Sequence, residues 1–318
     1  MKVPEVWEEA FEKVCQERPP KVLVLGGVDA GKSTFCLFLA RHLFEAGLSV
    51  ALLDADVGQK DVGPPTTIGL RHLKAEDFHS QRPLPADEMY FVGSVTPVGH
   101  LLPLVVGTGL LSRKSRAEVT IVNTTGLIKG PGVALKTFQI ENLSPDLIVA
   151  LEREEELAPI LEGFRHLKIL RLRVPQEVGR KDPTERRKRR EEAYRKYFSE
   201  AQSLSLPKEK VIWQRKRRLL PQLLLGVSDG KRHLGLAILE EVGEEHLRLF
   251  SPLPEEAHQI LICGSLLLKI PGQEMRPFRA NRSRKGSFPS RRRRSLRGRP
   301  RASGTPRRRV FQRSPARA

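Results

Sequence analysis

Cysteine is scarce in this sequence. Its 318 residues include three cysteines, Cys15, Cys36 and Cys263, and none of them belongs to a C-x-x-C motif. An odd number of cysteines without that spacing argues against a disulfide framework and against a structural zinc site. A reducing compartment such as the cytoplasm fits this composition best.

Long apolar runs are also missing. No run reaches the roughly 18 residues that a helix needs to cross a bilayer. Residues 1–20 begin with MKVPEVWEEAFEKVC, an acidic stretch with apolar residues at helical spacing, and they predict an amphipathic helix rather than a signal peptide. We therefore expect a soluble cytoplasmic protein that has no membrane partner.

Acidic residues are absent from one end of the sequence. Residues 275–318 hold 16 Arg, one Lys and no Asp or Glu, while in the rest of the chain 39 Lys and Arg face 37 Asp and Glu. The formal net charge of +19 therefore describes mainly this stretch. Its Arg-rich, core-poor composition predicts a disordered basic tail over residues 273–318. The sequence leaves two interpretations of the tail open: it makes non-specific contacts with nucleic-acid phosphates, or it has no selected function.

Short apolar segments alternate with helical patterns in the first half of the chain. Strands are expected at 21–27, about 49–54, 89–93, 118–123, 146–151 and 167–174, and a helix at 32–46. This alternation predicts an α/β fold with a doubly wound, mostly parallel sheet. With a charged helical lid at 179–200, the sheet would form a domain of residues 21–202. Short apolar runs separated by Gly, Asp and Pro predict a small β-rich domain over residues 203–272.

The segment GGVDAGKST lies between the first predicted strand and the first predicted helix, and it satisfies the pattern G-x-x-x-x-G-K-[ST]. In such a phosphate-binding loop, or P-loop, backbone N–H groups and the helix N-terminus bind phosphates. Lys32 would reach the β and γ oxygens, and the Ser33 hydroxyl would ligate Mg²⁺. The predicted ATP-binding residues are Gly26, Gly27, Val28, Asp29, Ala30, Gly31, Lys32, Ser33 and Thr34.

Two carboxylates, Asp54 and Asp56, end the second predicted strand in LLDADVGQ. They would lie at the carboxyl edge of the sheet beside the P-loop, where doubly wound folds bind ligands. Alternation along an extended chain points both to the same side, so one can approach Mg²⁺ while the other faces the attacking group. The candidate metal ligands are Ser33, Asp54 and Asp56, and a turn with solvated carboxylates is the structural alternative.

A P-loop alone does not choose among ATPase, GTPase and kinase. The guanine-specifying N-K-x-D pattern is absent, which argues against a GTPase. Partition-type ATPases often carry an additional lysine at the start of the loop, where this chain has Leu25. That difference weakens the hypothesis of an ATPase switch.

Four motifs together resemble the polynucleotide 5′-hydroxyl kinase family, whose members include kinases of mRNA 3′-end cleavage and of ribosomal-RNA processing. The motifs are the P-loop with its internal Asp29, LLDADVGQ followed by Pro64-Pro65, FVGSVTP at 91–97, and VNTTGLIKGPG at 122–132. The last motif departs from the family at Leu127, where many members have Trp. Leucine has no π face, so base stacking is not expected at this position.

A fifth segment, RRKRREEAYRKYF at 186–198, resembles the lid of that family, R-x-x-R-E followed by aromatic residues. The resemblance places Arg187 and Arg190 on the lid arginines that would stabilise the transferring group. Arg186 and Arg189 have the same spacing, so the register stays open by one residue. The positions that follow would be Glu191, Tyr194, Tyr197 and Phe198.

The resemblance implies an enzyme that transfers the γ-phosphoryl group of ATP, with Mg²⁺, to the 5′-hydroxyl end of RNA or DNA in RNA processing. It implies that the catalytic residues are Lys32, Asp56, Arg187 and Arg190, with Asp56 as the base. The candidates for holding the terminal nucleotide are Gln59, Thr124, Gly126 and the loop 93–97. The main alternative is a P-loop ATPase switch or assembly factor that binds a protein or nucleic-acid partner without phosphorylating it. A non-catalytic RNA-binding protein that acts through its tail is a third, and the sequence specifies no protein partner.

Overall fold

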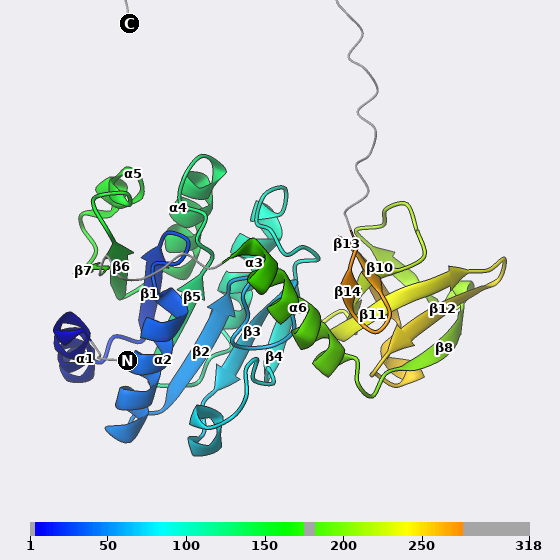
Figure 1. Cartoon of the computed structure of the whole chain (residues 1–318), viewed down its shortest axis with the longest axis horizontal. Helices are drawn as coiled ribbons and strands as arrows, with labels where there is room; N and C mark the ends of the chain where they lie inside the picture. Colours follow the sequence, from blue (N-terminus) through cyan, green and yellow to red (C-terminus); the bar gives the residue numbers. More distant parts are fainter. Residues whose placement is uncertain (1–3, 175–181, 276–318) are drawn as a thin grey trace, which may run out of the picture. The chain divides into compact units, whose positions relative to one another are not determined.

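A sheet with five parallel strands forms the centre of the computed structural model, which describes residues 4–174 and 182–275 (Figure 1). Strand β1 lies in the middle of the sheet, and later strands of the chain are added on both sides of it. In such sheets, ligands bind in the crevice at the carboxyl ends of the strands, at the point where the strand order reverses. In spatial order the parallel strands are β2 (Val50–Ala55), β5 (Val119–Thr124), β1 (Lys21–Gly26), β6 (Leu147–Glu152) and β7 (Ile169–Arg173).

Helices cover both faces of this sheet, and β1 shows why its sequence is apolar throughout. Val22 and Val24 belong to the core on one face, whereas Leu23 and Leu25 belong to the core on the other. Successive strand residues point to opposite faces, so a strand covered twice has no polar side. The first face is covered by α1 (Glu5–Glu17) and α2 (Lys32–Glu45), and the second by α3 (Leu101–Ser112), α4 (Pro131–Leu143) and α5 (Ala158–Leu161), which η2 (Glu162–Phe164) follows.

The sheet becomes antiparallel beyond β2. Strand β3 (Thr67–His72) pairs antiparallel with both β2 and β4 (Glu88–Phe91). Between β3 and β4 the chain forms only a short 3₁₀ turn, η1 (Ala75–Phe78), rather than the crossover helix that a parallel pair needs. The predicted doubly wound, mostly parallel sheet is confirmed. The sequence analysis did not predict β3, because Gly69 interrupts its apolar pattern.

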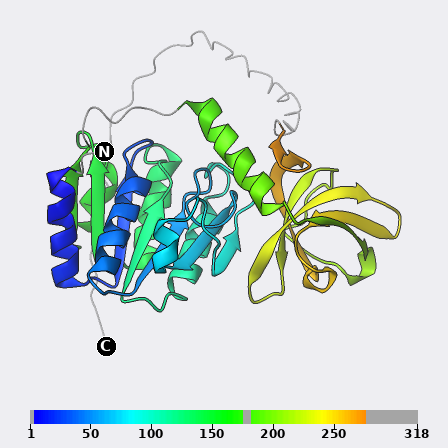
Figure 2. The ribbon, with the colours of Figure 1, turned by 60° about the horizontal axis from the view of Figure 1, so that its bottom comes forward.

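The lid helix α6 (Pro183–Tyr197) connects to a β-rich region whose strands are mostly antiparallel (Figure 2). Asp182 caps α6, because its side chain accepts a hydrogen bond from the N–H of Thr184. Tyr194 and Phe198 are buried against Phe91. The elements of this region are β8 (Gln202–Pro207), η3 (Lys208–Lys210), β9 (Ile212–Gln214), β10 (Leu223–Ser228), β11 (His233–Val242), β12 (His246–Ser251), η4 (Glu255–Ala257), β13 (Ile260–Lys269) and β14 (Gln273–Glu274).

Strand β14 corrects one expectation from the sequence. Gln273 and Glu274 were assigned to the basic tail, yet they pair with Lys269 and Leu268 of β13. A two-residue strand has no periodicity of its own, and only its partner strand reveals it. Residues 276–318 of the predicted tail and residues 179–181 of the predicted lid lie outside the described residues.

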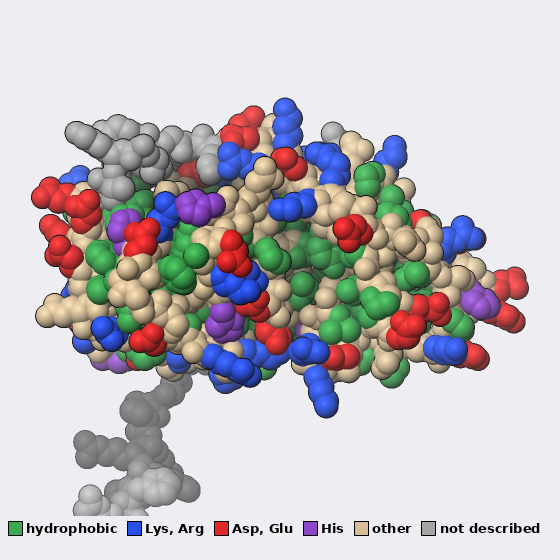
Figure 3. All heavy atoms as spheres, turned by 90° about the horizontal axis from the view of Figure 1, so that it is seen from below, with side chains coloured by type: hydrophobic (Ala, Val, Ile, Leu, Met, Phe, Trp, Pro, Cys, Tyr) green, Lys and Arg blue, Asp and Glu red, His purple; other side chains and the backbone are tan. Residues whose placement is uncertain are grey.

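The surface in Figure 3 carries acidic and basic side chains side by side, as expected for a chain that is nearly neutral outside its basic stretch. Within residues 4–174 and 182–275, no helix combines the length and the apolar character needed to cross a membrane.

Candidate active site

The P-loop occupies the turn between β1 and α2. Asp29 and Gly31 adopt left-handed backbone conformations, with φ of 57° and 82°. A side chain at Gly26 would lie 2.7 Å from the carbonyl oxygen of Leu151, so the loop packs tightly on the neighbouring strand. Lys32 Nζ donates a hydrogen bond to the carbonyl of Gly27 at 2.7 Å. Burial lowers the pKa of Lys32, whereas the nearby negative charge of Asp56 opposes that shift.

Asp54, at the end of β2, is completely buried and its carboxylate is fully engaged. It accepts hydrogen bonds from the backbone of Asp56, Asp61 and Val62 and from the side chain of Asn123. It also pairs with the buried ammonium group of Lys60 at 3.1 Å. Asp54 therefore anchors the loop that follows β2, and no part of its carboxylate faces the cleft beside the P-loop.

Asp56 has a different environment, although it lies only two residues further on. Its Oδ1 accepts hydrogen bonds from the N–H groups of Gly58 and Gln59, and its side chain lines the cleft beside the P-loop. Burial, together with the charge of Asp54, raises its pKa. A carboxylate with a raised pKa accepts a proton more readily, which suits a general base.

Asp61 is a site residue that sequence reasoning missed. It lies close to Ser33 of the P-loop, and both line a groove next to the cleft. Burial and the Asp54 carboxylate raise the pKa of Asp61 to about 6, although a hydrogen bond to Ser33 acts in the opposite sense. The signal that could have found it is a third acid in the loop after LLDADVGQ.

Two adjoining hollows meet at the P-loop. The first, here called the P-loop cleft, has a volume of about 450 Å³. The second, here called the lid groove, has a volume of about 730 Å³ and runs along α6. Ser33, Gly58, Gln59 and Arg190 line both. Residues of the cleft come from the P-loop (28–34), Asp56, 95–97, 125–127 and Arg186, and the groove adds basic side chains of Lys60, Arg82, Arg189, Arg195 and Lys196.

The predicted nucleotide-holding residues occupy different positions. Gln59 lines both hollows, and its side chain donates hydrogen bonds to the carbonyls of Gly58 and, at 3.4 Å, Arg186 of the lid. Gly126 lines the cleft and lies directly on Val28. Thr124, in contrast, is fully buried, and its hydroxyl donates to the carbonyl of Val24. Thr124 therefore supports the loop instead of facing the cleft.

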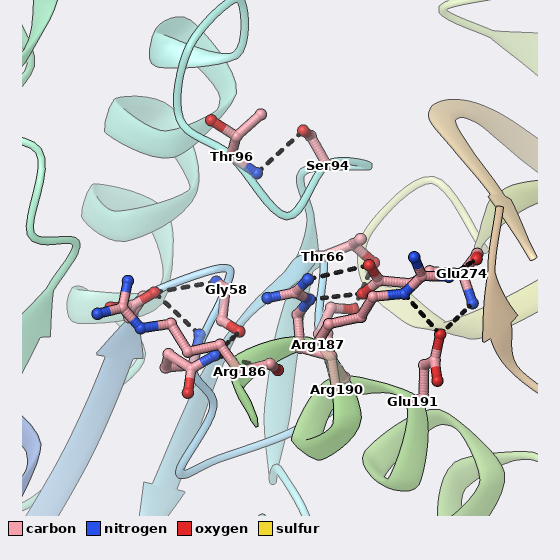
Figure 4. A network of polar contacts seen from close by, with 12 residues as sticks. Gly58, Thr66, Ser94, Thr96, Arg186, Arg187, Arg190, Glu191 and Glu274 are labelled. Atoms are coloured by element: carbon pink, nitrogen blue, oxygen red, sulfur yellow. Dashed lines mark hydrogen bonds and ion pairs between the residues drawn. The ribbon is translucent and has the colours of Figure 1, made fainter. Parts of the chain in front are cut away.

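The lid arginines divide between two kinds of partner. Arg186 forms an ion pair with Asp29 of the P-loop and lines the cleft. Arg187 bonds to Glu191 at 2.9 Å and to the carbonyl of Glu274, and it lines neither hollow. Arg190 lines both hollows and pairs with the Glu274 carboxylate (Figure 4).

Helix spacing accounts for the shared position of Arg186 and Arg190, which are four residues apart and both line the P-loop cleft. Arg187 and Arg190 both bond to Glu274, but of these two Arg190 alone also lines the hollows. Arg189 is half exposed and pairs with Glu185 at 2.6 Å while lining the lid groove. The predicted pair of Arg187 and Arg190 is thus not the pair that faces the P-loop cleft in this structure.

Comparison with known proteins decides the family. The family described as mRNA cleavage and polyadenylation factor CLP1 P-loop matches residues 26–200. This chain belongs to that family. The match spans the P-loop, both carboxylates and the lid helix.

Relatives in the family bear kinase names. The chain is 43% identical over 213 residues to a polyribonucleotide 5′-hydroxyl-kinase of Pyrococcus furiosus, covering 66% of this chain and 60% of the relative. It is 38% identical over 201 residues to one of Methanocaldococcus jannaschii, covering 61% and 55%. A chain of the solved Clp1p–Pcf11p complex has the same fold, with a TM-score of 0.67 at 14% identity, over 82% of this chain and 78% of that one. The matched part is thus 60% and 55% of the length of these two archaeal relatives.

Proposed function

We propose that this chain is an ATP-dependent polynucleotide kinase that transfers the γ-phosphoryl group to the 5′-hydroxyl end of RNA or DNA. The observation that carries the proposal is the P-loop cleft, where Lys32, Asp56 and two lid arginines line one hollow. The names of the family relatives support the same activity. A cytoplasmic location and a role in RNA processing stay predictions.

The chemistry requires positioning and charge neutralisation more than covalent catalysis. Loop amides and Lys32 hold the triphosphate, once Lys32 exchanges its hydrogen bond to the Gly27 carbonyl for phosphate oxygens. The 5′-oxygen forms a bond to the γ phosphorus while the bond to the β–γ bridging oxygen breaks. Asp56 accepts the hydroxyl proton, and ADP leaves.

The lid supplies positive charge to the transferring group. Arg186 and Arg190 are the lid arginines that line the P-loop cleft, so we assign this role to them. Arg187 lines neither hollow and bonds to Glu191 and to the carbonyl of Glu274, so we assign it a supporting role in the helix. In other phosphoryl-transfer enzymes an arginine finger accelerates the reaction by about 10³ to 10⁵.

The oxygen donors near the P-loop fit Mg²⁺. Hard oxygen ligands and substrate phosphates are its usual partners, and one or two protein groups suffice. The Ser33 hydroxyl with Asp56 or Asp61 provides such a set, whereas Asp54 has no oxygen left to offer. Bound there, Mg²⁺ would neutralise charge on the β and γ phosphates. Among the described residues, no cluster of three or more His, Cys, Asp or Glu is placed to hold a metal ion.

The competing hypothesis is a P-loop ATPase switch, and the family relatives do not favour it. One experiment separates the two. Purified protein is incubated with γ-labelled ATP and a 5′-hydroxyl oligonucleotide, and labelled oligonucleotide and free phosphate are both quantified. The kinase predicts one labelled end for each ATP consumed, and free phosphate alone would refute it.

A further inference from the structure

Glu274 of β14 holds the lid helix through four hydrogen bonds to three of its residues. Its carboxylate accepts from Nε and Nη2 of Arg190, the latter at 2.9 Å. Its backbone carbonyl accepts from Arg187, and its backbone N–H donates to Glu191 at 3.1 Å. Figure 4 shows the three side chains of α6 gathered around this residue. Glu274 is also 8% exposed, so the pair with Arg190 is shielded from water.

The bonds to Glu274 occupy one edge of the Arg190 guanidinium group, so its other edge can bind another partner. The carboxylate binds two of the three guanidinium nitrogens side by side, which fixes the plane of the group. The third nitrogen, Nη1, makes no hydrogen bond or ion pair with any residue in 4–174 or 182–275. The side chain meanwhile lines both the P-loop cleft and the lid groove.

The segment that carries Glu274 is itself firmly placed. It pairs with Leu268 of β13, and the N–H of Met275 donates to the carbonyl of Leu267 at 3.0 Å. In the turn before it, a side chain at Gly272 would lie 2.7 Å from Cβ of Tyr194, so this turn packs directly on the lid helix. Glu274 is therefore a fixed point against which Arg190 is oriented.

We propose that Glu274 is a positioning residue for phosphoryl transfer, which acts by orienting the guanidinium of Arg190 toward the γ-phosphoryl group. This inference rests on the proposed kinase function. Misplacing a catalytic group by about 1 Å can cost about 100-fold in rate. Loss of the carboxylate charge frees Arg190 to rotate while the P-loop itself is unchanged.

The test compares Glu274→Gln with wild type in the oligonucleotide-labelling assay. We expect kcat to fall by about 100-fold, with the KM for ATP little changed, since Lys32 and the loop amides remain in place. The matched control is Glu241→Gln, which removes a carboxylate from an exposed pair with Arg248 in the same β-rich region and should retain wild-type kcat.

A double-mutant cycle separates positioning from a general structural role. If Glu274 acts through Arg190, then Glu274→Gln should cause no further loss of kcat in the Arg190→Ala background. Additive losses, or an unchanged kcat in the single variant, would overturn the inference. Thermal unfolding checks that each variant folds. Should Glu274→Gln not fold, Glu274→Asp, which keeps the charge but shortens its reach, takes its place with the same expectations. Wild-type protein that labels no oligonucleotide would instead refute the kinase function, and this inference with it.

Discussion

Gly126 lies where the loop after β5 touches the P-loop, and a single added methyl group tests that contact. In Gly126→Ala the new Cβ would lie 2.7 Å from Cα of Val28 and 2.8 Å from its backbone nitrogen. Ordinary contacts begin near 3.4 Å, so the two loops must separate by about 0.7 Å. Both neighbouring atoms are backbone atoms, and no rotation of a side chain can relieve the clash.

The cost of this overpacking can be estimated. Inserting a methyl group into a well-packed site typically costs about 1–3 kcal/mol. If ATP binding requires the present separation of the loops, its dissociation constant should rise by about 5- to 150-fold. Titration calorimetry with ATP measures the change directly. The matched control is Gly163→Ala, because a Cβ at Gly163 has no neighbour within 4 Å.

The two variants give a clear decision. We expect Gly163→Ala to bind ATP like wild type and Gly126→Ala to bind it more weakly while remaining folded. A folded Gly126→Ala protein with wild-type affinity would show that the loop yields outward at no cost to the P-loop. That result would refute the reasoning from close contact.

Four further predictions concern the carboxylates and the lid. Asp56→Asn should retain ATP binding and lose turnover by orders of magnitude in the labelling assay; unchanged turnover would remove Asp56 as the base. Burial and the charge of Asp54 raise the pKa of Asp56, and a general base must be deprotonated to act. As the pH is lowered, kcat should therefore fall at a pH above the ordinary carboxyl pKa. A kcat that stays constant down to pH 4 would contradict this prediction. Arg186→Ala should lower kcat far more than Arg187→Ala, and the reverse order would assign the catalytic role to Arg187 instead of Arg186. Asp54→Asn should lower the free energy of unfolding by about 3–5 kcal/mol in urea denaturation, because its buried lysine partner loses its counter-charge, and a wild-type unfolding curve would exclude this anchoring role.

Local patterns in the sequence sufficed to predict the parallel strands of the core and the position of the P-loop. The run KVLVLGG is buried on both faces, and such a run indicates a central strand without any tertiary information. GGVDAGKST has a fixed spacing between strand and helix, so its position followed directly. Strand β3 was missed because Gly69 interrupts its apolar pattern, and its pairing with β2 and β4 decides its conformation.

The roles of individual site residues depend on contacts that the sequence does not encode locally. Asp54 and Asp56 look equivalent in a D-x-D pattern, but only the fold brings Lys60 and Asn123 to the first and saturates it. The lid arginines could not be chosen from R-x-x-R spacing, because the choice depends on which side chains of α6 line the P-loop cleft in the folded protein. Glu274 belongs to no sequence motif. Because it adjoins the Arg-rich stretch in the sequence, it was assigned to the basic tail instead of to a strand.

The central claim is that the P-loop cleft transfers phosphate to a 5′-hydroxyl end. The most direct measurement incubates the protein, Mg²⁺ and γ-labelled ATP with RNA and DNA oligonucleotides that end in either a 5′-hydroxyl or a 5′-phosphate, alongside a Lys32→Ala variant. The account predicts label only on 5′-hydroxyl ends and only with Lys32 present. ATP hydrolysis without labelled ends, or labelling that persists in Lys32→Ala, would contradict it.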